Sequence, residues 1–370
     1  MQRFISESTA EQVAAAIELP DSLIDAFSRA TYATVGPSAD AFAAFAKSYL
    51  PEVDSWVAAF EARRHPFAGK LPFLNFWYVA FSILCYFACV VVLLVISKIL
   101  GKGKYRLLLL AHNLFLYALS LYMSVAIFVS ARAANYSLWN NAAGESHAEW
   151  RLAKLLWLFY MSKVPEWVDT FVMCLKRNTH QITFLHLYHH SSVFLLWYVT
   201  CALAPGGEAY WSALVNSSVH VIMYGYYFLT TLFEEGKIRR FLNRFRFFIT
   251  KGQMVQFGVN CIQSVYDLYI VPREKLNYDA GLLQVLFVYM LTLLVLFGNF
   301  LLTAPKRDNA PVHLKPARSR GEPSKTKNGS SAKASKKHPG PAYQLKEQPV
   351  FVDSRKSQGR AGRGGKNKKN

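Results

Sequence analysis

Long apolar windows follow one another through the middle of the chain, and each is long enough to cross a membrane. A helix needs roughly 20 apolar residues to span the ~30 Å hydrocarbon core of a bilayer. The apolar runs are continuous and do not alternate in polarity, which favours helices over a β-barrel. The pattern therefore predicts an all-α integral membrane protein with seven transmembrane helices, at 73–96, 107–130, 152–175, 183–204, 210–233, 247–271 and 282–302. Polar side chains interrupt the third, fifth and sixth windows.

These windows divide the chain into three regions. Residues 1–72 carry short amphipathic segments, contain no predicted span and have no predicted role. Residues 73–303 hold the seven spans, and residues 304–370 form a tail rich in Lys, Ser, Gly and Pro. A segment of this composition cannot bury a core, so the tail is predicted to be disordered. It contains 18 Lys and Arg against 4 Asp and Glu, so most of the formal charge of +19 lies outside the spans and predicts no nucleic-acid partner.

Basic residues are distributed unevenly between the loops on the two sides of the predicted membrane. Loops on one side carry 11 Lys and Arg, and loops on the other side carry 4. The excess of positive charge places the first side in the cytosol, together with the tail, and the N-terminus in the lumen. Lys366 and Lys368 stand at positions that resemble a di-lysine retrieval signal, which predicts the endoplasmic reticulum membrane. The five cysteines lie in apolar segments and predict no disulfide framework.

Charged and polar side chains inside the third span form one face of a helix. Such side chains are costly in a membrane, and they usually face one another or a cavity. Lys163, Glu166, Asp169 and Thr170 recur at helical spacing in this span. Two interpretations stay open, a Lys–carboxylate network that holds the bundle together and direct participation in chemistry.

Three histidines occupy one face of the fourth span, near its cytosolic end. They are His186, His189 and His190. A single histidine in a helix is usually a satisfied core residue, but three on one face of a lipid-spanning helix indicate a functional site.

The fifth and sixth spans each present a polar stripe. In the fifth span the stripe consists of Asn216, His220, Tyr224 and Tyr227. Aromatic stripes usually serve packing, but the histidine and the asparagine favour a site here. In the sixth span the stripe consists of Gln253, Gln256, Asn260, Gln263 and Asp267. Hydrogen bonds between helices are the expected role of these side chains, with a share in lining a substrate channel.

Clustered histidines suit more than one chemistry. The histidines outside the stripes are scattered, so His220 alone is predicted to join the trio; the scattered ones are His65, His112, His147, His180, His313 and His338. Four histidines can hold one metal ion, so metal-dependent oxidation of a lipid chain is an alternative. Imidazole can instead act as nucleophile or general base in acyl transfer without a metal. Transport or proton-coupled signalling is a further alternative, because buried acids and histidines also suit proton relays.

Four motifs in these spans resemble those of the fatty-acid elongase (ELO) family, the very-long-chain 3-oxoacyl-CoA synthases. They are KxxExxDT at 163–170, HxxHH at 186–190, HxxMYxYY at 220–227 and TxxQxxQ at 250–256. The resemblance covers about 73–303 and leaves out the N-terminal region and the tail. It implies a fold of seven helices, six of which enclose a narrow acyl-chain tunnel that opens to the cytosol.

The resemblance also implies a reaction, the first step of fatty acid elongation. An acyl-CoA condenses with malonyl-CoA, carbon dioxide and CoA leave, and a 3-oxoacyl-CoA two carbons longer is formed. No cofactor and no metal are implied. The implied partners are the reductases and the dehydratase of the elongation cycle, and a homodimer stays open. The second and third motifs are more similar to those of elongases of polyunsaturated chains.

Histidine is the predicted nucleophile, because no cysteine lies in a motif. His189, or His190 beside it, is expected to take the acyl group, and His220 to stabilise the enolate or hold the thioester carbonyl. His186 is expected to orient its neighbours. A supporting polar network is predicted from Lys163, Glu166, Asp169, Thr170, Asn216, Tyr224, Tyr227, Gln253 and Gln256. Candidate cations for the CoA phosphates, which a cytosolic excess of charge also explains, are Lys176, Arg177, Lys237, Arg239, Arg240, Arg244 and Arg246.

Overall fold

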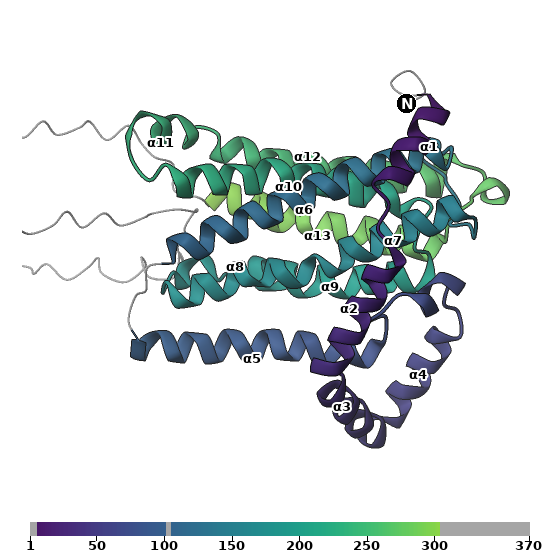
Figure 1. Cartoon of the computed structure of the whole chain (residues 1–370), viewed down its shortest axis with the longest axis horizontal. Coiled ribbons are helices and arrows are strands. Elements are labelled where there is room, and N and C mark those ends of the chain that lie inside the picture. Colours follow the sequence, from purple (N-terminus) through teal and green to yellow (C-terminus); the bar gives the residue numbers. More distant parts are fainter. Residues whose placement is uncertain (1–5, 101–104, 304–370) are drawn as a thin grey trace, which may run out of the picture. The chain divides into compact units, whose positions relative to one another are not determined.

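Helices form all of the regular structure in the described part of the chain. The computed structural model describes residues 6–100 and 105–303, so the predicted tail lies outside the described residues. Long helices run side by side, and shorter N-terminal helices lie at one end of them (Figure 1). The N-terminal helices are α1 (Glu7–Ala16), α2 (Asp21–Thr34), α3 (Gly36–Tyr49) and α4 (Pro51–Glu61). They are followed by α5 (Phe76–Leu100), α6 (Arg106–Ala133), α7 (His147–Met161), α8 (Lys163–Leu175), α9 (Phe184–Leu203), α10 (Ala209–Leu232), α11 (Gly236–Leu242), α12 (Arg246–Val265) and α13 (Ala280–Thr303).

Three helices within the described ranges are long and apolar enough to cross a membrane, namely α5, α6 and α13. Large apolar side chains on them face outward. Val91 and Val95 of α5 and Val288 and Val295 of α13 are exposed. Such faces suit the hydrocarbon of a bilayer better than water. Helices occupy the other predicted windows as well, but their polar content leaves the total of seven spans a prediction.

The prediction of one continuous helix at 152–175 is wrong. Two helices occupy this window: α7 begins earlier, after the N-cap Ser146, and ends at Met161, and α8 begins at Lys163. Pro165 provides the physical reason. A proline has no backbone N–H to donate to the carbonyl four residues earlier, here that of Met161, and its ring crowds that carbonyl. The break falls beside Lys163 and Glu166, at the start of the first motif.

Ion pairs fasten the N-terminal helices to α7. The side chains of Arg151 and Lys154 are buried, and both contact Glu18, at 3.0 Å from Arg151 Nε and 2.6 Å from Lys154 Nζ. Arg151 also donates to Glu11 of α1, and Lys154 lies 2.9 Å from Asp21 at the start of α2. Helices α1 to α4 lie in the region that had no predicted role, and we call them the strap. A charged cluster holds the strap at one end of the bundle (Figure 1).

An aromatic core holds α8 and α9 against their neighbours. Tyr160 of α7 stacks on Phe194 of α9 with ring centroids 4.8 Å apart, and Trp167 of α8 meets Phe194 edge-on at 4.9 Å. Buried aromatic pairs of this kind add to the free energy of burying the rings themselves. The packing fixes the two helices that carry the first and second motifs.

Candidate active site

Glu166 joins two of the predicted site residues through one carboxylate oxygen. Lys163 Nζ lies 2.7 Å from Glu166 Oε1 on the same turn of α8. His220 Nδ1 of α10 lies 3.4 Å from the same oxygen. All three side chains are buried. The Lys–carboxylate contact that the spacing indicates is present, and a histidine of the third motif contacts the same carboxylate.

The three histidines of the second motif meet near the start of α9. The rings of His186 and His190 have centroids 4.4 Å apart, and those of His189 and His190 are 5.6 Å apart. Thr183 caps the helix by accepting a hydrogen bond from the backbone N–H of His186 at 3.2 Å. The cap fixes the turn from which the first of these rings projects.

His186 also connects the second motif to the first. Its Nε2 lies 2.8 Å from Thr170 Oγ1, and that hydroxyl lies 3.0 Å from the hydroxyl of Tyr86 on α5. Tyr86 is buried and was not among the predicted site residues. Nothing in the spacing of its apolar window marks it, because its role depends on the packing of α5 on α8.

Asp169 has partners other than the Lys163–Glu166 pair. Its Oδ1 lies 3.1 Å from His112 Nε2 on α6, and its Oδ2 accepts a hydrogen bond from Tyr224 of α10 at 3.1 Å. His112, one of the histidines outside the predicted trio, is buried on α6 at this contact. The adjacent polar residues His112 and Asn113 inside an apolar window were a signal that a buried partner exists.

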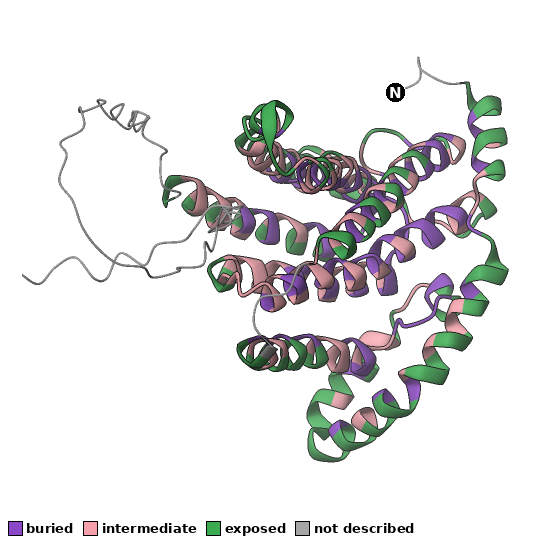
Figure 2. Cartoon of the chain, turned by 60° about the vertical axis from the view of Figure 1, so that its left-hand side comes forward, coloured by how far each residue is buried: buried purple, intermediate pink, exposed green. Residues whose placement is uncertain are grey.

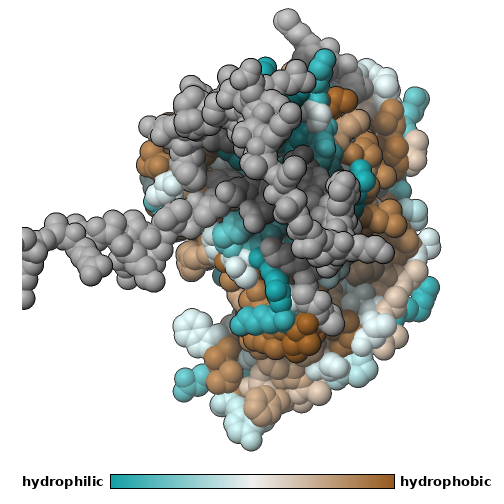
Figure 3. Space-filling model, turned by 90° about the vertical axis from the view of Figure 1, so that its left-hand side faces the viewer, coloured by the Kyte–Doolittle hydropathy of each residue, from teal (hydrophilic) through white to brown (hydrophobic). Residues whose placement is uncertain are grey.

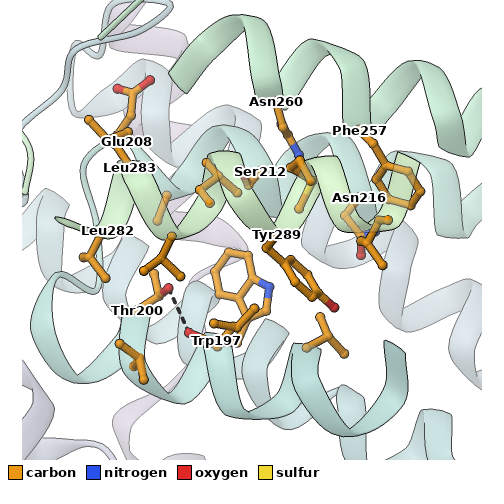
Figure 4. Close-up of a pocket in the computed structure, with 18 of the residues that line it drawn as sticks. Trp197, Thr200, Glu208, Ser212, Asn216, Phe257, Asn260, Leu282, Leu283 and Tyr289 are labelled. Carbon is orange, nitrogen blue, oxygen red and sulfur yellow. Dashed lines mark hydrogen bonds between the residues drawn. The ribbon is translucent and has the colours of Figure 1, made fainter. Parts of the chain in front are cut away.

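A cavity extends from His189 between α9, α10, α12 and α13 (Figure 4). It has a volume of about 840 Å³ including its open parts, and its walls are mainly apolar. Along α9 it reaches from His189 to Thr200, which is about 17 Å at 1.5 Å per residue. Its other wall carries Asn216 and Gln256. A long narrow apolar ligand with its reactive end at His189 fits this arrangement.

Several polar atoms of the cavity have no hydrogen-bond partner among the described residues. They are His189 Nδ1, Ser212 Oγ, Gln256 Oε1 and Asn260 Oδ1. His190 Nδ1, beside the cavity, is likewise unpaired within the described chain. Buried polar atoms without partners cost free energy, so they mark places where a ligand or water is expected to bind.

The stripe on the sixth window turns its polar side inward. Gln256, Asn260, Gln263 and Asp267 are buried, and Gln253 donates to the sulfur of Met223 at 3.5 Å. On the fifth window, the rings of Tyr224 and Tyr227 lie 6.1 Å apart. Both stripes therefore face the bundle interior as predicted.

Glu208 is a buried acid that the sequence interpretation missed. It lines the end of the cavity near Leu283 (Figure 4), and its Oε1 accepts a hydrogen bond from Gln263 at 2.6 Å. Its Oε2 accepts from the backbone N–H of Asn141 at 2.9 Å. Burial raises the pKa of Glu208 to about 8. The residue stands in a short loop after the fourth window, where no periodicity marks it.

The candidate CoA-binding cations belong to the segments that follow α8 and α10, and both segments lie at the left-hand end of the bundle in Figure 1. Hydrophilic and hydrophobic side chains are interspersed on this end (Figure 3). Arg177 donates from Nε to the carbonyl of Ser97 at 2.7 Å, and Arg239 donates to the carbonyl of Thr230, so both cap helix ends. Lys176 and Arg246 are half-buried, and burial lowers the pKa of Lys176. Exposed candidates are Lys237, Arg240 and Arg244.

No three His, Cys, Asp or Glu side chains in the described ranges are arranged to hold a metal ion. A product assay with a metal chelator is needed to decide between the metal-dependent and the metal-free alternatives.

The comparisons with known proteins agree on one family. Residues 71–311 match the family model described as "ELO: GNS1/SUR4 family". The chain is 56% identical over 303 residues to "Fatty acid elongase 6" of Leishmania major, which covers 82% of this chain and 80% of that protein. It is 35% identical over 205 residues to "Very long chain fatty acid elongase 5" of Tachysurus fulvidraco, covering 55% and 66% of the two chains. The corresponding human protein is 36% identical over 198 residues, which are 53% and 63% of the two chains.

Proposed function

The chain belongs to the ELO family of fatty acid elongases, and from this premise we propose that it catalyses the condensing step of chain elongation. Fatty acid elongation and acyl-CoA substrates follow from the family. The finer proposal is that a long-chain acyl-CoA reacts with malonyl-CoA to give a 3-oxoacyl-CoA, carbon dioxide and CoA. The observation that carries it is the position of His189, which lines the apolar cavity and stands beside the other histidines of its motif.

In the first proposed step, an imidazole nitrogen of His189 attacks the thioester carbonyl. The C–S bond breaks, CoA leaves as a thiol after taking up the proton that the imidazole loses, and an acyl-imidazole remains. The unpaired His189 Nδ1 supports this role, because it is not already engaged by a described protein group. The apolar cavity would hold the acyl chain and keep water away from the intermediate.

In the second proposed step, malonyl-CoA loses carbon dioxide and the electron pair of the broken C–C bond forms an enolate. The enolate carbon attacks the acyl carbon, and the C–N bond to imidazole breaks. The His189 ring takes up a proton from water as it leaves, and the 3-oxoacyl-CoA is released. His220 would stabilise the enolate oxygen or hold the thioester carbonyl. Its Nδ1 lies 3.4 Å from Glu166 Oε1, the oxygen that Lys163 Nζ contacts at 2.7 Å, so this carboxylate would orient the ring. Direct attack of the enolate on the thioester uses the same groups.

The proposed function extends to the position of the site in the membrane and to the groups that bind its substrates. Seven spans, six of them around the acyl tunnel, would place the cavity across the membrane of the endoplasmic reticulum, with the N-terminus lumenal and the C-terminus cytosolic. Lys237, Arg240 and Arg244 would offer cations to the CoA phosphates, since they are exposed at the end where α9 begins. A polyunsaturated acyl chain is the proposed substrate type, and the next enzymes of the cycle, two reductases and a dehydratase, would consume the product.

The test is a product assay with the purified chain in phospholipid vesicles. Malonyl-CoA labelled in the carbons that are retained would be supplied with a panel of saturated and polyunsaturated acyl-CoAs, with and without a metal chelator. Label in 3-oxoacyl-CoA at the same rate with chelator supports the proposal, and the fastest acyl-CoA gives the chain preference. Loss of labelled 3-oxoacyl-CoA with chelator would show that the condensation needs a metal ion and would overturn the metal-free mechanism. Absence of labelled product from folded protein with every acyl-CoA would refute condensation.

A further inference from the structure

Helices α3 and α4 form a hairpin with an exposed aromatic and aliphatic surface. We call this surface the elbow, and it consists of Phe45, Tyr49, Leu50, Val53 and Trp56. Trp56 is 78% exposed and Tyr49 is 71% exposed, and the rings of Phe45 and Tyr49 lie 4.6 Å apart. The hairpin is mostly exposed at the lower right of Figure 2. A contiguous surface of this kind is unfavourable in water and usually indicates a contact with lipid or protein.

The opposite side of the hairpin is fastened to the first turns of α5. Asp54 accepts a hydrogen bond from the indole of Trp77 at 3.0 Å, and Asp40 accepts one from the hydroxyl of Tyr78. The ring of Phe42 lies 5.6 Å from that of Phe81. These contacts attach the hairpin to α5 and leave the side chains of the elbow exposed.

The length of α5 shows at what depth in the bilayer the hairpin is attached. The helix has 25 residues, which makes it about 38 Å long. The hydrocarbon core of a bilayer is ~30 Å thick, so the terminal turns of α5 lie at the level of the lipid headgroups and the upper acyl chains. Trp77 and Tyr78 stand in the first turn, where Trp and Tyr are favoured in spanning helices. A hairpin attached to this turn lies at the same level.

We infer that the elbow is embedded in the interfacial region of the lipid leaflet beside α5. The position of the hairpin at the start of a spanning helix, the Trp and Tyr in the elbow and its aliphatic neighbours each match what interfacial helices present to lipid. The elbow continues the lipid-facing side of α5, on which Val91 and Val95 are exposed. The N-terminal strap is thus held twice, by its charged cluster on α7 and by lipid at the elbow.

Site-directed spin labelling of the full chain in phosphatidylcholine vesicles tests the inference. The accessible cysteines Cys85, Cys89 and Cys261 are first replaced by Ala, and Trp56→Cys then carries one nitroxide. Collision rates with oxygen, which partitions into lipid, and with a nickel chelate, which stays in water, are compared. The reference positions are Val91→Cys on the exposed side of α5 and Asp25→Cys on the exposed side of α2.

We expect the oxygen-to-nickel ratio at position 56 to be several-fold above that at position 25 and to approach that at position 91. A ratio equal to that at position 25 would place the elbow in water and overturn the inference. Low accessibility to both reagents together with spin–spin broadening would show a second copy of the chain on the elbow and would overturn it too. Tyr49→Cys gives an independent reading at a second elbow position if Trp56→Cys does not fold.

Discussion

Removing the charge of Glu166 should destabilise the protein strongly, even when the shape of the side chain is almost unchanged. Glu166→Gln keeps the size of the side chain but leaves Lys163 without its carboxylate. The two side chains are only 2% and 4% exposed, so water cannot replace the lost partner. Breaking a buried ion pair from one side costs about 3–5 kcal/mol. The ring of Phe159, 3.9 Å from Lys163 Nζ, offsets only part of this cost.

A double variant separates stability from activity. Lys163→Met with Glu166→Gln removes both charges, and replacing a buried pair by groups of similar size is often neutral in stability. We expect the free energy of unfolding of the double variant to lie within about 1 kcal/mol of that of the unmodified protein. Its activity should stay low, because His220 still lacks the carboxylate 3.4 Å from its ring.

The assay is the fraction of protein that elutes as a monodisperse peak after heating in detergent, followed by product formation at a permissive temperature. Arg63→Gln serves as a control, since its ion pair with Asp279 is exposed and should contribute at most about 1 kcal/mol. If Glu166→Gln unfolds no earlier than the control, the buried-charge argument fails. If the double variant is as unstable as the single one, Lys163 is not the source of the cost.

Other predictions concern the strap, the loops and the cavity. Arg151 donates a hydrogen bond to Glu11 and holds the pKa of that carboxyl below its ordinary value. The ion pair therefore stabilises the docked strap above the ordinary pKa of Glu11, and this stabilisation is lost as the pH falls through the lowered pKa. Protection of α1 from proteases should decrease at acidic pH. Tyr136→Phe should lower the free energy of unfolding by about 1–3 kcal/mol at unchanged turnover, since the Tyr136 hydroxyl donates to the half-buried acid Glu149; an unchanged unfolding temperature would contradict this. Ser212→Phe, which fills the cavity far from His189, should shorten the longest acyl-CoA that is elongated, as seen in the product lengths; unchanged lengths would remove the cavity from the acyl site.

Local spacing predicted what lies within one helix or on one face. Lys163 and Glu166 are three residues apart on α8, so their pairing follows from helix geometry alone. The inward direction of the polar stripes on α10 and α12 was predictable for the same reason, because polar side chains in an apolar window avoid lipid.

Partners between helices were not predictable, because they depend on which helices pack together. Asp169 is separated from its partner His112 by 57 positions, and no periodicity relates them. The same holds for the strap, where Arg151 meets Glu11 across 140 positions. The break after Met161 could have been predicted from the sequence, since Pro165 follows four residues later and proline breaks helices.

The central claim is that His189 carries the condensation at the head of the acyl cavity, and the most direct measurement compares two histidine variants. His189→Ala and His180→Ala, the latter an exposed histidine just before α9, would be assayed in vesicles with labelled malonyl-CoA and the preferred acyl-CoA. The account predicts that His189→Ala loses at least about 10³-fold in 3-oxoacyl-CoA formation, as expected for a nucleophile, while keeping its elution profile, and that His180→Ala stays near full activity. Condensation by folded His189→Ala at a rate within a few-fold of the unmodified chain would contradict the account.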